Sequence, residues 1–271
     1  MTLAHFRQQF DPILFATLKI YQMRLPVVES SLLTELLRYP EQLFQGGKRV
    51  RPYLASLLYT NLGGELSNET LRFFSALEFL QAFCLIHDDI IDEGETRHGI
   101  PTLHRYTHRQ LQQKGRRGNC KHLGNAQAML IGDLIFSWSM DLARQGPGNM
   151  LVRLRSQELF FRMIDEVVIG QLMDVDLSTR ATATLTEIEQ KMRLKTAGYT
   201  FVKPLEIGAS LCSSSARIKR FCEEFGGALG LAFQWQDDLF DLTGNIARTK
   251  KTCFSDLLTR QQTPYTHHIR T

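Results

Sequence analysis

Two acidic triplets of the same form constrain this 271-residue chain more than any other feature. The pattern D-D-x-x-D occurs at Asp88, Asp89 and Asp92, and again at Asp237, Asp238 and Asp241. Each triplet follows an apolar stretch, FLQAFCLI or ALGLAF, whose residues recur at helical spacing. One such triplet alone would favour a solvated acidic helix end. Two of them, each ending an apolar helix, instead predict an acidic mouth above an apolar cavity.

The first triplet has the geometry of a cation site if residues 77–92 form a helix. Steps of four and seven residues nearly complete whole turns, so Gln81, Asp88 and Asp92 lie nearly in line. Two carboxylates one turn apart repel each other unless a cation lies between them. Hard oxygen ligands with room for water and phosphate oxygens suit Mg²⁺ that bridges to a diphosphate. Arg97 follows in the next loop and can meet the same anion.

The second triplet has a similar face, on which Gly230, Gln234, Asp237 and Asp241 lie together if the segment is helical. If the two acidic helices face each other, several Mg²⁺ ions would turn their carboxylates into an anion trap. The pairing of the two triplets is specific, and it makes a merely solvated surface the minor alternative.

Composition indicates a soluble, globular chain, with 43% hydrophobic and 22% charged residues. A chain of this length buries roughly three quarters of its unfolded surface. The net charge of +4 is too small to indicate a nucleic-acid partner. A basic cluster at 105–122 contains Gly115, Gly118 and Asn119 and is interpreted as a solvated surface loop, with an anion or RNA patch as the less favoured alternative.

Cysteine usage and the chain ends bear on location. The five cysteines form no C-x-x-C pair and indicate reduced thiols, which predicts a cytoplasmic protein. The N-terminal residues lack the basic start and apolar core of a signal peptide. No apolar run approaches eighteen residues, so any membrane contact is expected to be peripheral.

Apolar residues recur at spacings of three and four, and strand signals are nearly absent, which predicts an all-α fold. The expected helices are 2–24, 29–38, 48–62, 67–92, 123–144, 148–176, 184–194, 196–212, 214–242 and 253–261. The sequence T-E-I-E at 186–189 predicts a capping box. Because no Pro-rich or Ser-rich linker divides the chain, residues 1–271 are expected to form one domain.

The sequence F-Q-G-G-K-R-V-R-P at 44–52 places two glycines before a basic helix start. The glycines allow close backbone approach, and helix N-terminal amides with Lys48, Arg49 and Arg51 would form an anion site. An ordinary basic surface is the alternative.

Two further polar groups interrupt apolar patterns. The sequence G-Q-x-x-D at Gly170, Gln171 and Asp174 lies inside an expected helix, where polar groups need partners. These polar residues are interpreted either as partners in a core hydrogen bond or as part of the wall of the cation site. Lys195 with Thr196 precedes small residues and can reach a cavity, whereas spacing alone places Lys251 and Asp256 at the surface.

Together these motifs resemble, in content and order, the polyprenyl (isoprenyl diphosphate) synthase family over about residues 40–257. The shared motifs are Gly46-Gly47-Lys48-x-x-Arg51-Pro52, the first D-D-x-x-D with Arg97 and Gly99-x-Pro101-Thr102, Gly170-Gln171-x-x-Asp174, Lys195-Thr196, and Phe233-Gln234-x-x-Asp237-Asp238-x-x-Asp241. The resemblance implies a single isoprenoid-synthase domain, a bundle of mostly antiparallel helices around a central apolar cavity, and a homodimer. It implies head-to-tail transfer of an allylic diphosphate to isopentenyl diphosphate.

The resemblance also implies roles for individual residues. Three Mg²⁺ on the allylic diphosphate would be held by Asp88, Asp92 and Asp237, with Asp174 and Asp241 as further metal-site residues. The same diphosphate would be bound by Arg97 and Lys195, and closed over by Lys251. Isopentenyl diphosphate would be held by Gly47, Lys48, Arg51, Gln81 and His98. The developing carbocation would lie near Lys195, Thr196 and Gln234.

The chain departs from the family pattern in a few places. His98 stands where the family usually has a second arginine, and Gln81 stands where many members have histidine. The family often has lysine where Gln261 stands. Only fifteen residues follow Asp256 in the 271-residue sequence, so the chain is expected to be short at its C-terminus.

Residues before the first aspartate bear on product length. In the family, the fourth and fifth residues before it form the floor of the cavity, and here they are Cys84 and Phe83. This pattern, without an insertion in the first motif, resembles geranylgeranyl diphosphate synthases, with farnesyl diphosphate as the second expectation. The alternatives of another class are a non-catalytic homologue that serves as a partner subunit and a class I terpene cyclase. Missing membrane spans exclude a membrane prenyltransferase.

Overall fold

A computed structural model describes residues 1–243 and 261–270. The chain divides into two compact units, and each is considered by itself. Unit 1 comprises Met1–Tyr53 and Leu66–Pro147, and unit 2 comprises Leu54–Glu65 and Gly148–Thr271. Almost all regular structure is helical, as the apolar spacing predicts. None of the described helices is long and apolar enough to cross a membrane.

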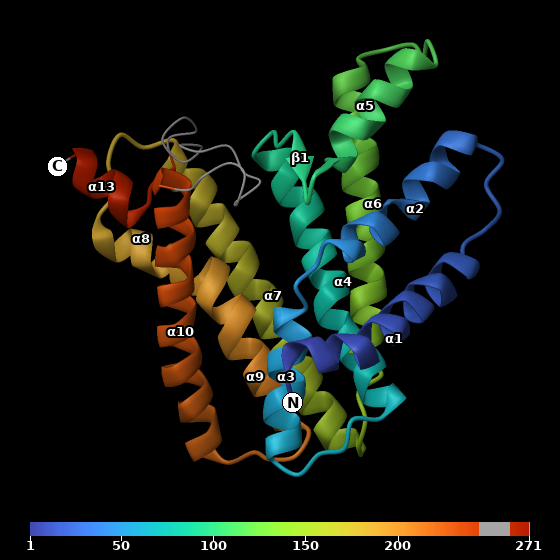
Figure 1. The fold of residues 1–271 in the computed structure, drawn as a ribbon. Coiled ribbons are helices and arrows are strands. Elements are labelled where there is room, and N and C mark those ends of the chain that lie inside the picture. The colour runs from blue at the N-terminus through green and yellow to red at the C-terminus, as the bar shows by residue number, and fades with distance from the viewer. Residues whose placement is uncertain (244–260, 271) are drawn as a thin grey trace. The chain divides into compact units, whose positions relative to one another are not determined.

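Unit 1 is built on two long helices that lie side by side in opposite directions (Figure 1). Its elements are α1 (Leu3–Met23), α2 (Ser31–Gln45), the start of α3 (Val50–Asn61), α4 (Asn68–Ile91), β1 (Thr96–Arg97), β2 (Ile100–Pro101), α5 (Leu103–Gln113) and α6 (Cys120–Ala143). Helix α4 packs along α6, while α1 and α2 pack on α4. Aromatic rings of Tyr21, Phe79 and Trp138 meet in the core, with centroids 5.6 to 6.3 Å apart.

Helix α4 carries the first acidic triplet and is apolar on nearly all sides because other helices surround it. Ser67 caps its N-terminus by accepting a hydrogen bond from the amide of Thr70. Most of its residues from Leu71 to Ile86 are buried. It ends with Asp92 as the C-terminal cap, so the acidic triplet occupies its last turn.

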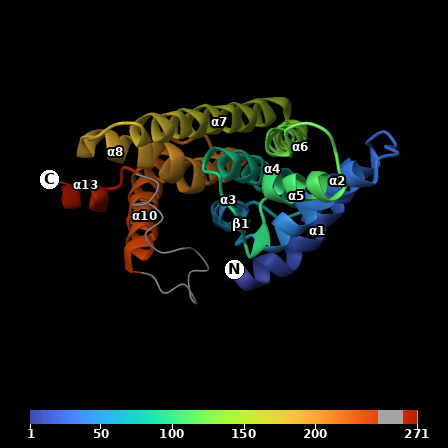
Figure 2. The same cartoon turned by 90° about the horizontal axis from the view of Figure 1, so that it is seen from above.

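Unit 2 is organised around a stretch of π-helix. Its elements are the rest of α3, α7 (Met150–Ser178), α8 (Leu185–Met192), the π-helix η1 (Arg193–Val202), α9 (Lys203–Ser210), α10 (Ala216–Thr243) and α13 (Pro264–Arg270). Segment η1 packs against α7, α8, α9 and α10. Viewed from above, α13 lies beside α8 (Figure 2). A small apolar core of Leu177, Ala183, Ile188 and Met192 supports this end.

Glycines let η1 approach its neighbours closely. A Cβ atom at Gly170 of α7 would lie 2.5 Å from the backbone nitrogen of Lys195, and one at Gly230 of α10 would lie 2.4 Å from Cα of Ala197. A side chain at either position would therefore push η1 away. Sequence spacing predicts an ordinary helix here with a break at residue 195, whereas the structure runs continuously from α8 through η1 into α9.

Three local predictions are wrong. The basic segment 105–122 is not all loop, because α5 covers Leu103–Gln113 and buries Leu103, Thr107 and Leu111 at four-residue spacing. Helix α2 does not stop at residue 38 but continues through Pro40 to Gln45, because its apolar face continues through Tyr39, Leu43 and Phe44. The capping box lies one half-turn earlier than expected, between Thr184 and Glu187.

Candidate functional site

The first acidic triplet separates into a buried and a more exposed part. Asp89 is buried, and its Oδ1 atom accepts hydrogen bonds from Nε and Nη2 of Arg97 at 3.0 and 2.5 Å. Asp88 is half-buried, with Oδ2 3.7 Å from Nη2 of the same arginine, and Asp92 is exposed. The middle aspartate therefore supports Arg97, and Asp88 and Asp92 are the carboxylates that a metal or a ligand can reach.

Burial raises the pKa of Asp89 to about 6, although the charge and hydrogen bonds of Arg97 oppose that rise. Asp89 is also held in the loop by its backbone, because its carbonyl accepts a hydrogen bond from the amide of Gly94 at 2.9 Å. Thr102 closes the same loop by donating to the carbonyl of Gly94 at 2.7 Å. These bonds give Thr102 of the motif a structural function, because they hold the loop that places Asp89 against Arg97.

A two-residue hairpin presents Arg97 and His98. Strands β1 and β2 pair Arg97 with Ile100, and the connecting residues His98 and Gly99 both have positive φ, 53° and 82°. Short hairpin turns of this kind favour residues that tolerate the left-handed region, which include glycine and, among the others, histidine. The pKa of His98 is lowered by partial burial and by the charges of Arg97, Lys48 and Arg49, so the imidazole is neutral at pH 7.

The two glycines before the basic segment serve side-chain packing. A Cβ atom at Gly46 would lie 2.4 Å from the His98 ring, and one at Gly47 would lie 2.0 Å from Nη1 of Arg49. The absence of side chains at Gly46 and Gly47 therefore makes room for the His98 ring and the Arg49 guanidinium. Gly47 is thereby a neighbour of Arg49, while Lys48 beside it is exposed.

Arg49 does not belong to an anion site, contrary to the prediction. Its side chain is buried and donates to Asp11 at 2.7 Å, to Glu78 at 3.0 Å and to the carbonyl of Phe44 at 2.5 Å. Two carboxylates neutralise this guanidinium, so it has a structural function. Of the three basic residues here, Lys48 and the half-buried Arg51 remain candidates for an anion.

Residues predicted to limit product length lie on α4 against α6. Phe83 is half-buried, and its ring centroid lies 4.8 Å from Phe136 of α6 and 4.5 Å from His87. Cys84 and Gln81 are also half-buried on α4. Phe83 and Phe136 thus form one aromatic wall.

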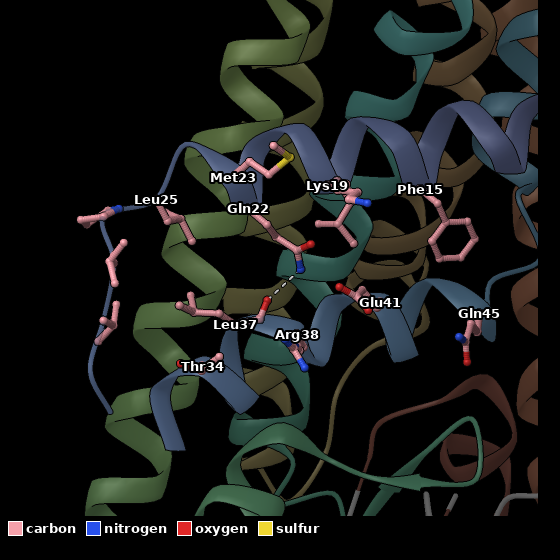
Figure 3. Close-up of a pocket in the computed structure, with 14 residues that line it drawn as sticks. Phe15, Lys19, Gln22, Met23, Leu25, Thr34, Leu37, Arg38, Glu41 and Gln45 are labelled. Carbon is pink, nitrogen blue, oxygen red and sulfur yellow. Dashed lines mark hydrogen bonds between the residues drawn. The ribbon is translucent and has the colours of Figure 1, made fainter. Parts of the chain in front are cut away.

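A separate cavity of about 850 Å³ lies between α1 and α2 (Figure 3). Its lining includes Phe15, Lys19 and Arg38, and Gln22 bridges it by donating to the carbonyl of Leu37 at 3.0 Å. None of the predicted site residues lines it.

In unit 2, Asp174 is held by two lysines. The carboxylate is buried, and its Oδ1 accepts from Nζ of Lys191 at 3.0 Å while its Oδ2 accepts from Nζ of Lys195 at 2.5 Å. Burial alone would raise the pKa of Asp174, but the two ammonium groups outweigh it and hold that pKa below its ordinary value. Asp174 therefore has a hydrogen-bonded partner in Lys195 and a second one in Lys191, and the sequence motifs did not reveal either pairing.

A hydrogen-bonded chain joins η1 to the second acidic triplet. Thr196 donates to Oε1 of Gln234 at 2.6 Å, and Nε2 of Gln234 donates to Oδ1 of Asp238 at 2.6 Å. Burial raises the pKa of Asp238 to about 6, against the Gln234 hydrogen bond and the charge of Lys191. Asp237 is half-buried, and Asp241 is buried. As in the first triplet, the middle aspartate is bound by a neighbouring side chain.

Within the described part of the chain, no three His, Cys, Asp or Glu side chains are gathered closely enough to hold a metal ion by themselves. The donor chemistry nevertheless fits a hard divalent cation, because the triplets offer carboxylate oxygens at helix ends. A donor set of one or two carboxylates leaves positions for water or for oxygens of a substrate. Lys251, the last predicted site residue, lies outside the described residues.

Comparison with solved structures defines the fold as the all-α isoprenoid-synthase fold. The chain superposes on geranylgeranyl pyrophosphate synthase from Corynebacterium glutamicum, crystallised with isoprenyl diphosphate and magnesium. The TM-score is 0.90 and the identity 29%, over 97% of this chain and 75% of the other. The family model of polyprenyl synthetase matches residues 31–270, and the chain belongs to that family.

The relatives of this chain are named for different products. Geranylgeranyl diphosphate synthase from Methanosarcina mazei is 28% identical over 81% of this chain and 64% of its own length. Farnesyl diphosphate synthase from Geobacillus stearothermophilus is 32% identical, over 78% of this chain and 67% of the relative. The chain spans 59% of the Sulfolobus acidocaldarius geranylgeranyl diphosphate synthase, so it corresponds to about three fifths of such relatives.

Proposed function

We propose that this chain is a short-chain isoprenyl diphosphate synthase that joins isopentenyl diphosphate to an allylic diphosphate and releases diphosphate. One observation carries the proposal. In each D-D-x-x-D triplet a neighbouring side chain binds the middle aspartate, Arg97 for Asp89 and Gln234 for Asp238. A solvated acidic surface would not need such support. The first aspartates, Asp88 and Asp237, are then held in place for a metal-bound diphosphate.

Mg²⁺, held by Asp88, Asp92 and Asp237, would neutralise the charge that develops on the departing diphosphate. Arg97 and Lys195 add positive charge for the same leaving group. The allylic carbon–oxygen bond breaks, and its electron pair leaves with diphosphate. The double bond of isopentenyl diphosphate then forms the new carbon–carbon bond. A proton is lost from the neighbouring carbon, and the departing diphosphate accepts it, so no histidine base is required.

The remaining residues have complementary functions in this proposal. Isopentenyl diphosphate is bound by Lys48, Arg51, Gln81 and His98. The carbonyl of Gln234 and the Thr196 hydroxyl lie one hydrogen bond apart, and both offer oxygen dipoles to a carbocation. Lys251 is proposed to close over the allylic diphosphate. Asp174 and Asp241 are proposed to complete the surroundings of the metals.

The favoured product is geranylgeranyl diphosphate, with farnesyl diphosphate second. Relatives with each of these names support a short product, and the Phe83–Cys84 pair supports the longer of the two. The test incubates the chain with isopentenyl diphosphate and each allylic diphosphate in Mg²⁺, followed by analysis of product chain length. A chelator control should abolish turnover, and added Mg²⁺ or Mn²⁺ should restore it. Full turnover in excess chelator would exclude the mechanism.

We also propose a homodimer. Exposed apolar side chains recur at seven-residue spacing along α7, at Leu154, Phe161, Val168 and Val175. Such a stripe on a long helix favours contact with another helix. Light scattering during size-exclusion chromatography should give twice the mass of one 31.1 kDa chain. The non-catalytic subunit hypothesis predicts instead that the chain alone is inactive and gains activity only with a different partner.

A further inference from the structure

A buried lysine outside the family motifs joins three segments of unit 2. Lys191, at the end of α8, has only 8% of its surface exposed. Its Nζ atom donates to Oδ1 of Asp174 on α7 at 3.0 Å and to the backbone carbonyl of Gln262 at 2.8 Å. Gln262 is itself buried and donates to the carbonyl of Arg180 at 3.1 Å. The ammonium of Lys191 is thus fixed by partners on two sides.

The position of Lys191 matters because of the second lysine on the same carboxylate. Asp174 gives one oxygen to Lys191 and the other to Lys195. A buried carboxylate is costly unless it is paired and hydrogen-bonded. If Lys191 were absent, Lys195 would be the remaining lysine partner of this charge. The attraction that holds Lys195 on Asp174 would then increase.

Other charges near Lys191 come from α10. Its positive charge opposes the burial effect on Asp238, and Asp174 acts on Asp238 in the opposite direction. Asp237 and Asp241 lie in the same helix end. Lys191 therefore acts on the carboxylates of both Asp174 and Asp238, and loss of its charge changes the electrostatic balance at the carboxylate that it shares with Lys195.

We propose that Lys191 is a positioning residue that shares the charge of Asp174, so that Lys195 can turn its ammonium to the allylic diphosphate. This inference rests on the proposed function, in which Lys195 binds that diphosphate. Lys191 itself touches no substrate in this proposal. Its effect passes through Asp174 to Lys195 and is specific for the allylic substrate.

The test compares Lys191→Met with a matched control, Lys219→Met. Lys219 is an exposed lysine of α10 that forms an ion pair with Glu223 at 3.7 Å. Loss of one charge-assisted hydrogen bond should raise the KM for the allylic diphosphate about tenfold. The KM for isopentenyl diphosphate should stay within about twofold of wild type. Lys219→Met should change neither. Equal changes in both KM values, or none, would overturn the proposal.

A double variant separates positioning from simple loss of stability. Lys195→Gln raises the KM for the allylic diphosphate by itself, and Lys191→Met added to it should raise that KM no further, because the effect of Lys191 passes through Lys195. A structural lesion at Lys191 would instead raise the KM by the same factor in both backgrounds. The melting temperature, measured by circular dichroism, identifies any variant that fails to fold, and Lys191→Gln then replaces Lys191→Met.

A binding measurement keeps this inference separate from the proposed function. Calorimetry with the unreactive S-thiolo analogue of the allylic diphosphate in Mg²⁺ should give a Kd about tenfold higher for Lys191→Met than for wild type. If wild type binds the analogue but turns over no substrate, the proposed function fails. The inference is then supported by a higher Kd of Lys191→Met for the analogue. If wild type does not bind the analogue, or if both proteins bind it equally, the inference is overturned.

Discussion

The hydroxyl of Thr196 lies 2.6 Å from Oε1 of Gln234, a hydrogen bond that links the π-helix η1 to the helix that carries the second acidic triplet. Gln234 passes the connection on to Asp238 at 2.6 Å. The two motifs, separated by 38 residues in the chain, therefore act as one unit of structure. Residues in one hydrogen-bond network show coupled effects on mutation.

This network gives a first prediction. Thr196→Val and Gln234→Leu should each lower kcat about tenfold, because each leaves a partly buried polar partner without its hydrogen bond. The double variant should lose less than the product of the two single effects. Steady-state kinetics of the four proteins measures the coupling. Independent, multiplicative effects would show that the two side chains act separately.

The second prediction contrasts neighbouring aspartates of the first triplet. Asp88→Ala should lower kcat by orders of magnitude with little change in stability, because a metal ligand acts mainly in the transition state. Asp89→Ala removes the partner of Arg97 and should lower the free energy of unfolding by about 1–3 kcal/mol. Urea denaturation and turnover are measured on both variants. The reverse pattern would mean that Asp89 is the metal ligand. Asp237→Ala should behave like Asp88→Ala.

Sequence patterns predict the helical class and most long helices because apolar spacing of three and four survives in every packed segment. They do not reveal the Lys195–Asp174 pair, and they place Thr196 near Gln234 only through the family resemblance, since the sequence separations are 21 and 38 residues. The π-helix could not be predicted, because its stability comes from close packing against Gly170 and Gly230. The same holds for α5, whose short apolar face is hidden among basic residues.

Roles of charged residues were the hardest part to predict. Lys48, Arg49 and Arg51 look alike in the sequence, but Arg49 is buried and hydrogen-bonds to Asp11 and Glu78. Its backbone has a positive φ of 61°, which local spacing does not indicate. Lys191 shows no pattern that marks it as a partner of Asp174. Tertiary placement decides which cation is structural, and local spacing carries little of that information.

The third prediction separates the two diphosphates. Arg51→Ala should raise the KM for isopentenyl diphosphate about tenfold and leave the KM for the allylic diphosphate within about twofold. Arg97→Ala should do the opposite, and it should also destabilise the fold because buried Asp89 loses its ion pair. The KM values are measured for each substrate with the other saturating. Equal effects of both variants on both substrates would refute the assignment of two sites.

The fourth prediction concerns pH and His98. Its pKa in the folded state is lowered from 6.5 by burial and three nearby cations, so the unfolded chain binds more protons below that pH. Stability contributed by this residue is therefore present above the unfolded pKa and is lost as the pH falls through 6.5 and below.

His98→Asn is the matched variant, because asparagine tolerates the positive φ of 53° without titrating. The free energy of unfolding of wild type relative to His98→Asn should fall as the pH is lowered from 7.5 to 5.5. The buried carboxyl groups of Asp89 and Asp238, with raised pKa values of about 6, act in the opposite direction in both proteins and cancel in the difference. A difference that does not change with pH would contradict the lowered pKa of His98.

The last prediction concerns product length and the aromatic wall on α4 and α6. The growing chain is proposed to extend from Asp88 along α4 toward Phe83 and Cys84. Phe83 packs on Phe136 with centroids 4.8 Å apart, so removal of either ring should open space of a few methylene groups. Phe83→Ala should lengthen the product beyond that of wild type, and Phe136→Ala should do so to a smaller extent. Cys84→Phe should shorten it toward farnesyl diphosphate, because a ring then fills the half-buried position of the thiol.

Products are dephosphorylated and compared by chain length, with the melting temperature of each variant as the control for cavity formation. An unchanged product distribution in all three variants would place the end of the cavity at another wall.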